Sequence, residues 1–177
     1  MKLFENIRGV AGGNFGLVTA AEARKLGVGS FQLARWVKMG WLEHSARGVY
    51  RLSDYPPSPY DYYAIAVEEV GADAMLYGES VLGMLELTST NPEKIRVGTV
   101  NQRFRKRVSD GVVVYRMLMD SKPELYEGVR CQPLVEAILA SRDSVVPSRC
   151  IEAAENAFRK GYILRWEFQM LRKEIKR

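Results

Sequence analysis

Gln32, Arg35 and Lys38 are the side chains near the start of the chain whose types and spacing point most clearly to a chemistry. Arginine and lysine bind phosphate oxygens or guanine, and glutamine binds adenine, when a helix presents them to the major groove of DNA. At intervals of three residues, these side chains lie on one side of a helix. The pattern predicts a DNA-contacting face. The alternative is that they are ordinary solvated positions, since most surface helices carry lysine and arginine.

A short helix over residues 20–25 is predicted to precede that face. Thr19 is a suitable N-cap, Glu22 lies three residues further on as in a capping box, and Gly27 is placed to end the helix. Two basic residues of this helix are placed to contact backbone phosphates: Arg24 and Lys25.

Residues 31–39 are predicted to form the helix that carries the candidate face. Ser30 is predicted to cap it, and Leu33 and Val37 lie one turn apart on its buried side. Ser30 is also a candidate DNA-contacting residue. Two helices joined by a short glycine-containing turn form a helix-turn-helix, in which the second helix enters the major groove.

A β-hairpin, the wing, is predicted directly after this helix. Its strands are residues 41–44 and 49–52, joined by a turn at residues 45–48. Arg47 lies in that turn, where it could reach a phosphate or an adjacent minor groove. Three aromatic side chains of the motif are predicted to pack in the core or the wing and not to stack on bases: Trp36, Trp41 and Tyr50.

A first helix over residues 3–11 is predicted to complete a three-helix core. Leu3, Ile7 and Val10 recur at helical spacing and are predicted to pack against the helix-turn-helix. Residues 1–52 are therefore predicted to form a winged helix-turn-helix, a DNA-binding domain.

The net charge of the chain is concentrated in this segment. Residues 1–52 contain 8 lysine or arginine residues and 3 acidic ones, whereas residues 53–177 contain 18 of each sign. The whole surplus of +5 lies in the predicted DNA-binding domain. Such a distribution favours a polyanion as partner.

The remaining chain predicts a second domain of mixed α and β structure with a small sheet, so the fold class is α+β. Residues 53–59, with three prolines in four positions, predict an extended, semi-rigid linker to a domain at residues 60–177. The predicted strands are residues 95–100, 112–116 and 129–131. The predicted helices are residues 60–70, 78–85, 133–140, 148–160 and 165–176.

A second basic cluster lies in the segment between the first two of these strands, residues 101–111, which we name the basic loop. Four cations surround Phe104 in it: Arg103, Arg105, Lys106 and Arg107. Such a cluster could contact phosphates or an acidic partner surface. A charged hairpin loop that only keeps the edge of the sheet soluble is at least as good an interpretation.

The sequence offers little support for catalysis. His44 is the only histidine, and no phosphate-binding glycine motif is present. We therefore expect no catalytic residue, no metal site and no cofactor. Cys131 and Cys150 are expected to be reduced and mostly buried. The chain has no apolar run long enough to cross a bilayer, and its first residues are charged, so a cytoplasmic protein without membrane contact is expected.

Three segments of the chain resemble the AbiEi family, the antitoxins of type IV toxin–antitoxin systems: GLVTAAEARKLGV, WVKMGWLEHSARGVYRL and YGESVLGMLEL. The run GWLEHSARGVYRL, residues 40–52, is the most specific of these features. The resemblance implies an antitoxin that represses its own operon by binding inverted repeats in double-stranded DNA. It also implies antagonism of a nucleotidyltransferase toxin of the AbiEii type without a stable complex, a role associated with the C-terminal domain of the family.

The modest affinity of one helix for DNA leads to an expectation about how many protein molecules bind the operator. A single helix in one major groove binds modestly, so two molecules on adjacent half-sites of the operator are expected. Two other functions fit the same sequence, and a nuclease or other enzyme is a third, weaker rival. The basic first domain could bind an acidic protein as an interaction module, or the chain could be a regulator that has no toxin partner.

Overall fold

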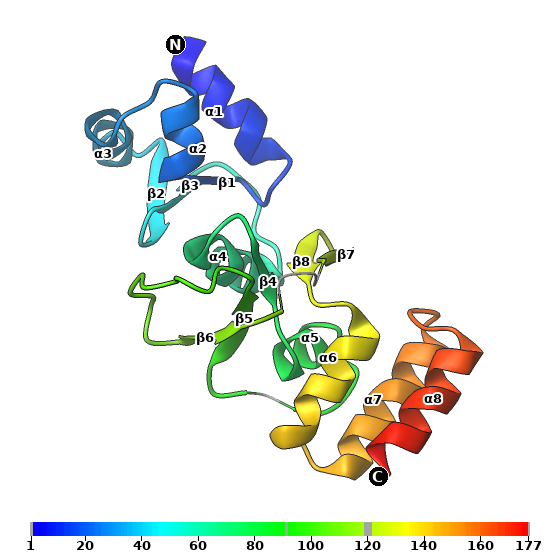
Figure 1. The fold of residues 1–177 in the computed structure, drawn as a ribbon. Helices are drawn as coiled ribbons and strands as arrows, with labels where there is room; N and C mark the ends of the chain where they lie inside the picture. Colours follow the sequence, from blue (N-terminus) through cyan, green and yellow to red (C-terminus); the bar gives the residue numbers. More distant parts are fainter. Residues whose placement is uncertain (1, 91, 119–121, 177) are drawn as a thin grey trace.

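The computed structural model describes residues 2–90, 92–118 and 122–176, so the outermost residues of the two predicted domains, Met1 and Arg177, lie outside it. Within these ranges the chain folds as α+β, with a three-stranded sheet near the N-terminus and a five-stranded sheet after it. Figure 1 shows the N-terminal elements at one end of the molecule and helices α7 and α8 at the other. The predicted fold class is confirmed.

The N-terminal unit combines helices with an antiparallel sheet in the order β1-β3-β2. Its elements are α1 (Lys2–Gly12), β1 (Leu17–Thr19), α2 (Ala20–Lys25), α3 (Ser30–Lys38), β2 (Leu42–Ala46) and β3 (Val49–Leu52). This is a winged helix-turn-helix, with α2 and α3 as the helix pair and β2 and β3 as the wing. The sequence pattern does not predict β1, because three residues directly before a helix are too few to show alternation.

Helix α1 packs on this unit through a face that differs from the predicted one. Phe4 and Ile7 are buried, whereas Leu3 is 45% and Val10 is 39% exposed, so the prediction that Leu3 and Val10 pack here is wrong. The buried face is rotated by one residue because the Phe4 ring packs edge-on against Trp36 of α3, with ring centroids 5.1 Å apart. A large aromatic ring buries more apolar area than Leu3 could at that place.

The C-terminal unit has a mixed sheet in the order β6-β5-β4-β8-β7. Its strands are β4 (Ala74–Leu76), β5 (Ile95–Thr99), β6 (Val112–Arg116), β7 (Glu124–Tyr126) and β8 (Val129–Cys131). Its helices are α4 (Asp61–Val70), α5 (Glu79–Met84), α6 (Leu134–Ala140), α7 (Pro147–Arg159) and α8 (Arg165–Ile175), with a 3-10 turn at Ser141–Asp143. The predicted helices and strands all occur within one residue of the expected bounds, and β4 and β7 are additional.

Strands β5 and β6 are parallel neighbours, with Ile95 opposite Val112 and Thr99 opposite Arg116. The interpretation of the basic loop as a hairpin is therefore wrong. A hairpin would make the two strands antiparallel, whereas the basic loop carries the chain back to the end of the sheet at which β5 began. The loop is a crossover connection that projects from the sheet.

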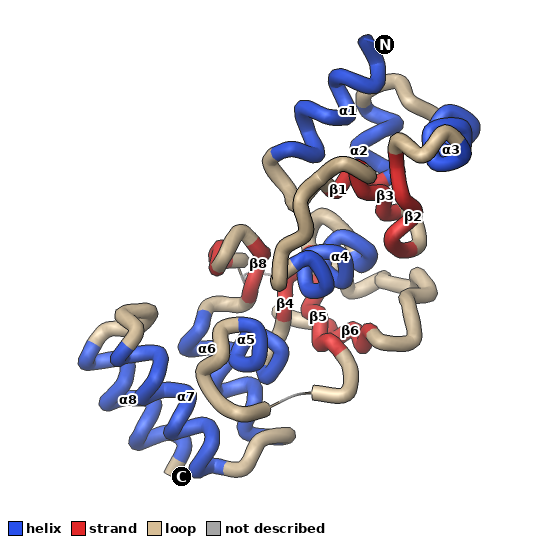
Figure 2. Tube along the Cα trace, turned by 180° about the vertical axis from the view of Figure 1, so that it is seen from behind, coloured by secondary structure: helices blue, strands red, loops and turns tan. Residues whose placement is uncertain are grey.

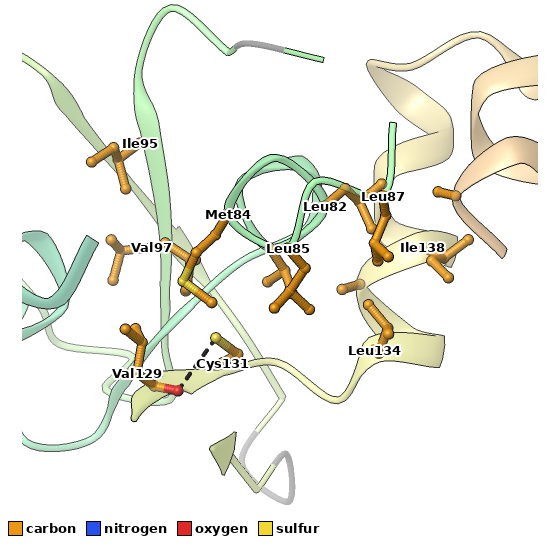
Figure 3. Packing of buried hydrophobic residues seen from close by; sticks show 14 of the residues in the cluster. Leu82, Met84, Leu85, Leu87, Ile95, Val97, Val129, Cys131, Leu134 and Ile138 are labelled. Carbon is orange, nitrogen blue, oxygen red and sulfur yellow. Dashed lines mark hydrogen bonds between the residues drawn. The ribbon is translucent and has the colours of Figure 1, made fainter. Parts of the chain in front are cut away.

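The core of the C-terminal unit lies between its sheet and helices α5 and α6. Figure 3 shows Leu82 of α5 with Leu134 and Ile138 of α6 in one cluster of side chains, and all three are buried. Cys131 joins this core from β8. Both cysteines of the chain are free and buried, as expected. Burial raises the pKa of the Cys131 thiol to about 12, so this thiol is a packing group and not a reactive one.

The two units share a continuous apolar contact. Leu17 of β1 and Val49 of β3 are fully buried and belong to the same cluster of buried side chains as Val67 of α4. Figure 2 shows α4 between the wing sheet and the larger sheet. The N-terminal unit is therefore packed on the C-terminal unit and does not hang from a free linker.

A polar contact holds the proline-rich segment between the units. The Arg51 guanidinium of β3 lies 3.0 Å from the Asp61 carboxylate at the start of α4, and the two side chains are only 13% and 19% exposed. Asp61 also accepts the backbone N–H of Ser58 at 2.9 Å, and Arg51 donates to the carbonyl of Pro56 at 3.0 Å. The ion pair thus joins the wing to the first helix of the second unit and pins the chain between them.

Replacing Asp61 with alanine should lower the free energy of unfolding by about 2–3 kcal/mol, because it leaves a partly buried guanidinium without its counter-ion. Urea unfolding monitored by circular dichroism measures this loss. Asp54→Ala is the matched control, because it removes the exposed Arg8–Asp54 ion pair, whose side chains are 45% and 60% exposed. The control should leave the unfolding midpoint nearly unchanged. Equal effects of the two substitutions would contradict this account of the junction.

Candidate nucleic-acid interface

Helix α2 begins with the capping box that the sequence predicts. The Thr19 hydroxyl accepts the backbone N–H of Glu22 at 3.2 Å, and the Glu22 carboxylate accepts the backbone N–H of Thr19 at 2.8 Å. The wing supplies a further cap, because the Gly48 carbonyl accepts the N–H of Ala20 at 2.8 Å. These bonds satisfy N–H groups that the first turn of a helix cannot pair internally. They also fix α2 against the wing.

The turn between α2 and α3 is set by Gly27, which has a φ of +79°. The Gly27 N–H bonds to the carbonyl of Arg24 at 3.0 Å, and the Val28 N–H bonds to that of Ala23 at 2.9 Å. These two bonds form a Schellman motif, in which the left-handed residue is usually glycine. The Val28 side chain is only 2% exposed, so it anchors the turn in the core of the N-terminal unit. The predicted end of α2 is confirmed.

Helix α3 begins one residue earlier than predicted. Gly29 occupies the N-cap position without a side-chain bond, and Ser30 is already the first helical residue, so the prediction that Ser30 caps the helix is wrong. Gly29 can adopt the extended cap conformation itself, which leaves the Ser30 hydroxyl on the exposed surface. Leu33 and Trp36 form the buried stripe of α3, while Val37 is half-buried beside it.

The outer face of α3 carries the candidate base-contacting residues. Arg35 and Lys38 are exposed, as predicted, and no acidic residue lies in this helix. Gln32 is half-buried, so its side chain is less accessible than those of the two cations. The reason is that the buried stripe centres on Leu33 and Trp36, to which Gln32 is adjacent. The two cations lie near the C-terminal end of α3, where the negative end of the helix dipole stabilises positive charge.

Phe31 is a residue of this face that the sequence pattern did not single out. Its side chain is 82% exposed in the first turn of α3. Helical spacing places it one turn before Arg35 and two turns before Lys38, on the same side. A signal was present in the sequence, since Phe31 stands apart from the Leu33 and Trp36 stripe. Aromatic residues are usually assigned to the core by default, which hides such a position.

Arg24 and Lys25 lie in the last turn of α2, and both are exposed. Their neighbour Ala23 is fully buried, so the backbone at this point is held by the core while the two basic side chains extend into solvent. Both side chains are thus accessible near the turn before α3, and their contact with backbone phosphates stays a prediction.

The wing differs in detail from the predicted hairpin. Strand β2 continues to Ala46, with a register shift between His44 and Ala46, so the turn consists of Arg47 and Gly48. Gly48 has a φ of +76°, which a tight hairpin turn requires. Arg47 is exposed at the tip, as expected.

The three aromatic side chains of the motif behave largely as predicted. Trp36 is buried, and Tyr50 is half-buried with its ring 5.1 Å from that of His44. Trp41 packs against Phe4 with ring centroids 4.9 Å apart but keeps 39% of its surface exposed. All three therefore support the unit by packing.

The structure brings the two basic features together. The Lys106 ammonium lies 3.9 Å from the position that a Cβ would occupy on Gly48, at the wing tip. It donates a hydrogen bond to the carbonyl of Glu69. Partial burial lowers the pKa of Lys106, an effect that Glu69 opposes and the nearby Arg47 reinforces. Figures 1 and 2 both show the loop between β5 and β6 just beyond the wing.

All four cations of the basic loop have exposed side chains: Arg103, Arg105, Lys106 and Arg107. Arg107 and Arg47 line one surface hollow of about 500 Å³ together with Glu69. Glu69 is 1% exposed, and its carboxylate accepts the N–H of Ser109 at 3.1 Å, so a buried residue holds the loop in place. Lys106 and Arg107 therefore bring the basic loop close to the wing tip at Gly48 and Arg47.

The described residues were also compared with the requirements of a metal site and of a membrane span. Among residues 2–90, 92–118 and 122–176, no group of three histidine, cysteine or acidic side chains is arranged to hold a metal ion. None of the helices in these ranges has the length and apolar character that a membrane span requires.

The helix pair with a Schellman turn, the three-stranded sheet and the exposed basic face of α3 define the N-terminal unit as a winged helix-turn-helix. Residues 8–53 of the chain match the sequence profile of the AbiEi_4 family, described as "Transcriptional regulator, AbiEi antitoxin". The resemblance inferred from the sequence is thereby confirmed for this region. Over residues 77–87, which lie outside the match, it stays a prediction.

Comparison with solved structures gives a distant similarity. The crystal structure of the RV2827C protein from Mycobacterium tuberculosis aligns with 98% of this chain and 82% of its own chain. The sequence identity is 14% and the TM-score is 0.43. No curated protein matches the chain in sequence.

Proposed function

We propose that this protein binds double-stranded DNA through α3 and represses transcription of its own operon. The observation that carries the proposal is the outer face of α3, where Arg35 and Lys38 stand exposed on a helix whose opposite side is buried. The family match over residues 8–53 supports a role in transcriptional regulation. The concentration of net positive charge in residues 1–52 supports a polyanionic partner.

The proposed contacts divide into two groups. Arg35 and Lys38 are assigned to base edges and adjacent phosphates in the major groove, with Gln32 and Ser30 at its margin. Contacts to backbone phosphates are assigned to Arg24, Lys25 and the wing residue Arg47. One such helix binds modestly, so two molecules bind adjacent half-sites of an inverted repeat.

The basic loop extends this phosphate-binding surface. Its support is the position of Lys106 beside the wing tip and of Arg107 in one hollow with Arg47, while Arg103 and Arg105 are exposed in the same loop. In this proposal residues 1–52 supply sequence recognition, residues 53–59 hold the junction, and the domain at residues 60–177 adds electrostatic affinity through one loop.

Toxin antagonism is the second part of the proposal and rests on the antitoxin family alone. We assign it to the domain at residues 60–177, acting against a nucleotidyltransferase toxin of the AbiEii type without a stable complex. The alternative function is a protein-interaction module or a regulator that has no toxin partner. The Arg35 and Lys38 face would then bind an acidic protein surface.

Reversal of the two cations on α3, Arg35→Glu with Lys38→Glu, should weaken binding to the DNA upstream of the coding sequence by about 100-fold or more. The substitutions remove favourable contacts and add repulsion from phosphates, while both side chains lie outside the core. Fluorescence anisotropy on a labelled duplex measures the change.

The matched control is Arg165→Glu with Lys173→Glu, which changes the net charge equally on exposed positions of α8, at the far end of the molecule. The control should lose much less affinity, and both variants should retain the circular dichroism spectrum of the wild type. If the α3 variant bound the DNA with the full affinity of the wild type, α3 would not be the recognition helix.

Replacing Arg103, Arg105 and Arg107 together with alanine should reduce the slope of log affinity against log salt concentration, by about 0.9 for each phosphate that the loop no longer neutralises. Preference for upstream over scrambled DNA should stay the same, because phosphate binding carries no sequence information. The control removes three exposed cations elsewhere, Arg159, Arg165 and Lys173. If the two triple variants share one salt dependence, the loop makes no phosphate contact.

Co-expression of this protein with an AbiEii-type toxin should restore bacterial growth, and the variant with Arg35→Glu and Lys38→Glu should restore it equally well. The reason is that the proposal assigns toxin antagonism to the second domain and DNA binding to the first. Growth curves of induced cultures provide the measurement. Failure of both forms to restore growth would leave a regulator without this antitoxin activity, and failure of the variant alone would show that α3 takes part in antagonism.

A further inference from the structure

The first turn of α3 presents an isolated aromatic ring to solvent. Phe31 is 82% exposed, more than any other large apolar side chain in the described parts of the chain. Exposing a phenyl ring contributes nothing to stability, since burial of such a side chain is worth about 1.5–3 kcal/mol. Single exposed apolar residues are common on protein surfaces, so the meaning of Phe31 depends on its position.

Its position is the part of a recognition helix that comes closest to base edges. In helix-turn-helix proteins the N-terminal residues of the second helix contact the bases in the major groove. Phe31 shares its face with Ala34, Arg35 and Lys38, at intervals of three, four and seven residues. The face thus combines two cations, which phosphates and guanine attract, with a ring and a methyl group that cannot form hydrogen bonds.

The major groove has one apolar feature that suits such a pair, the C5-methyl group of thymine. A protein partner fits the same face less well, because an exposed ring flanked by alanine and two cations does not form the contiguous apolar patch of an interaction surface. Helix α3 and its caps, all of which the structure describes, expose one other large apolar side chain, Met39. Met39 is the C-cap of the helix and lies two turns away from Phe31.

We propose that Phe31, with Ala34 beside it, packs against a thymine methyl group in the major groove and makes the protein selective for thymine at that step of its operator. This inference rests on the proposed DNA-binding function and deepens it. Arg35 and Lys38 draw the helix to DNA, and Phe31 distinguishes sequences that the cations alone would bind alike.

The test is a four-way comparison of two proteins and two DNAs. The proteins are the full chain and its Phe31→Ala variant, which removes an exposed ring and leaves the core intact. The DNAs are the duplex upstream of the coding sequence made with thymine, and the same duplex made with uracil, which lacks the C5-methyl group. A scrambled thymine duplex completes the set, and affinities are measured by fluorescence anisotropy.

The wild type should bind the uracil duplex about fourfold or more weakly for each methyl group that the protein covers. Phe31→Ala should bind the thymine duplex about tenfold more weakly than the wild type does. The variant should lose most of its discrimination between thymine and uracil. Trp166→Ala, which removes a 62% exposed ring from α8, should behave as the wild type on both duplexes.

Two results would overturn the inference while leaving the proposed function intact. One is selective wild-type binding to the upstream duplex that Phe31→Ala does not weaken. The other is an equal penalty for uracil in the wild type and in Phe31→Ala, which would place the methyl contact elsewhere. If the wild type binds upstream and scrambled DNA alike, the proposed function itself fails, and this inference fails with it.

Discussion

The apolar contact between the wing sheet and helix α4 is the constraint on which the rest of the structure depends. Leu17 and Val49 are fully buried in the same cluster as the core of the C-terminal unit. Separating the units would expose these side chains to water. The contact therefore keeps α3, the wing and the basic loop at fixed positions relative to one another. A flexible tether would leave the basic loop free to move away from the wing, whereas here both belong to one surface.

Electrostatics and apolar contact have different roles on that surface. In the proposed complex with DNA, the exposed cations of α2, α3, the wing and the basic loop contact the phosphate backbone, which gives affinity that depends on salt and not on sequence. Selectivity needs groups that discriminate base edges, and the proposal assigns this role to Arg35, Lys38 and the exposed ring of Phe31 on α3. The capping box at Thr19 and the left-handed Gly27 make the helix pair rigid enough to present them together.

Most of the fold could be predicted from the sequence, because its local signals are strong. Thr19 and Gly27 marked the ends of α2 through side-chain capping and backbone freedom, and both act as expected. Strand β4 escaped prediction because Ala74, Met75 and Leu76 are all apolar, and so short an apolar run cannot be distinguished from a helix segment by its period. The parallel pairing of β5 and β6 also could not be foreseen, since strand direction depends on the path of the loop between them and not on local composition.

The candidate site was only partly predictable for a similar reason. The exposure of Arg35 and Lys38 could be predicted from helical spacing, but the half-burial of Gln32 could not, because the buried stripe of α3 depends on how Trp36 meets Phe4 of another helix. The proximity of Lys106 to the wing tip is a tertiary contact between segments far apart in the chain. No pattern in either segment indicates it.

The most direct test of the central claim is equilibrium binding of the wild-type protein to the duplex upstream of its coding sequence, against scrambled DNA, across a series of salt concentrations. The account predicts tighter binding to the upstream duplex at every salt concentration, with log affinity falling linearly with log salt on both DNAs. Equal affinity for the two duplexes would contradict it and reduce the basic surface to a general polyanion contact. Absence of binding even at low salt would also contradict it and would favour an acidic protein as the partner of the same surface.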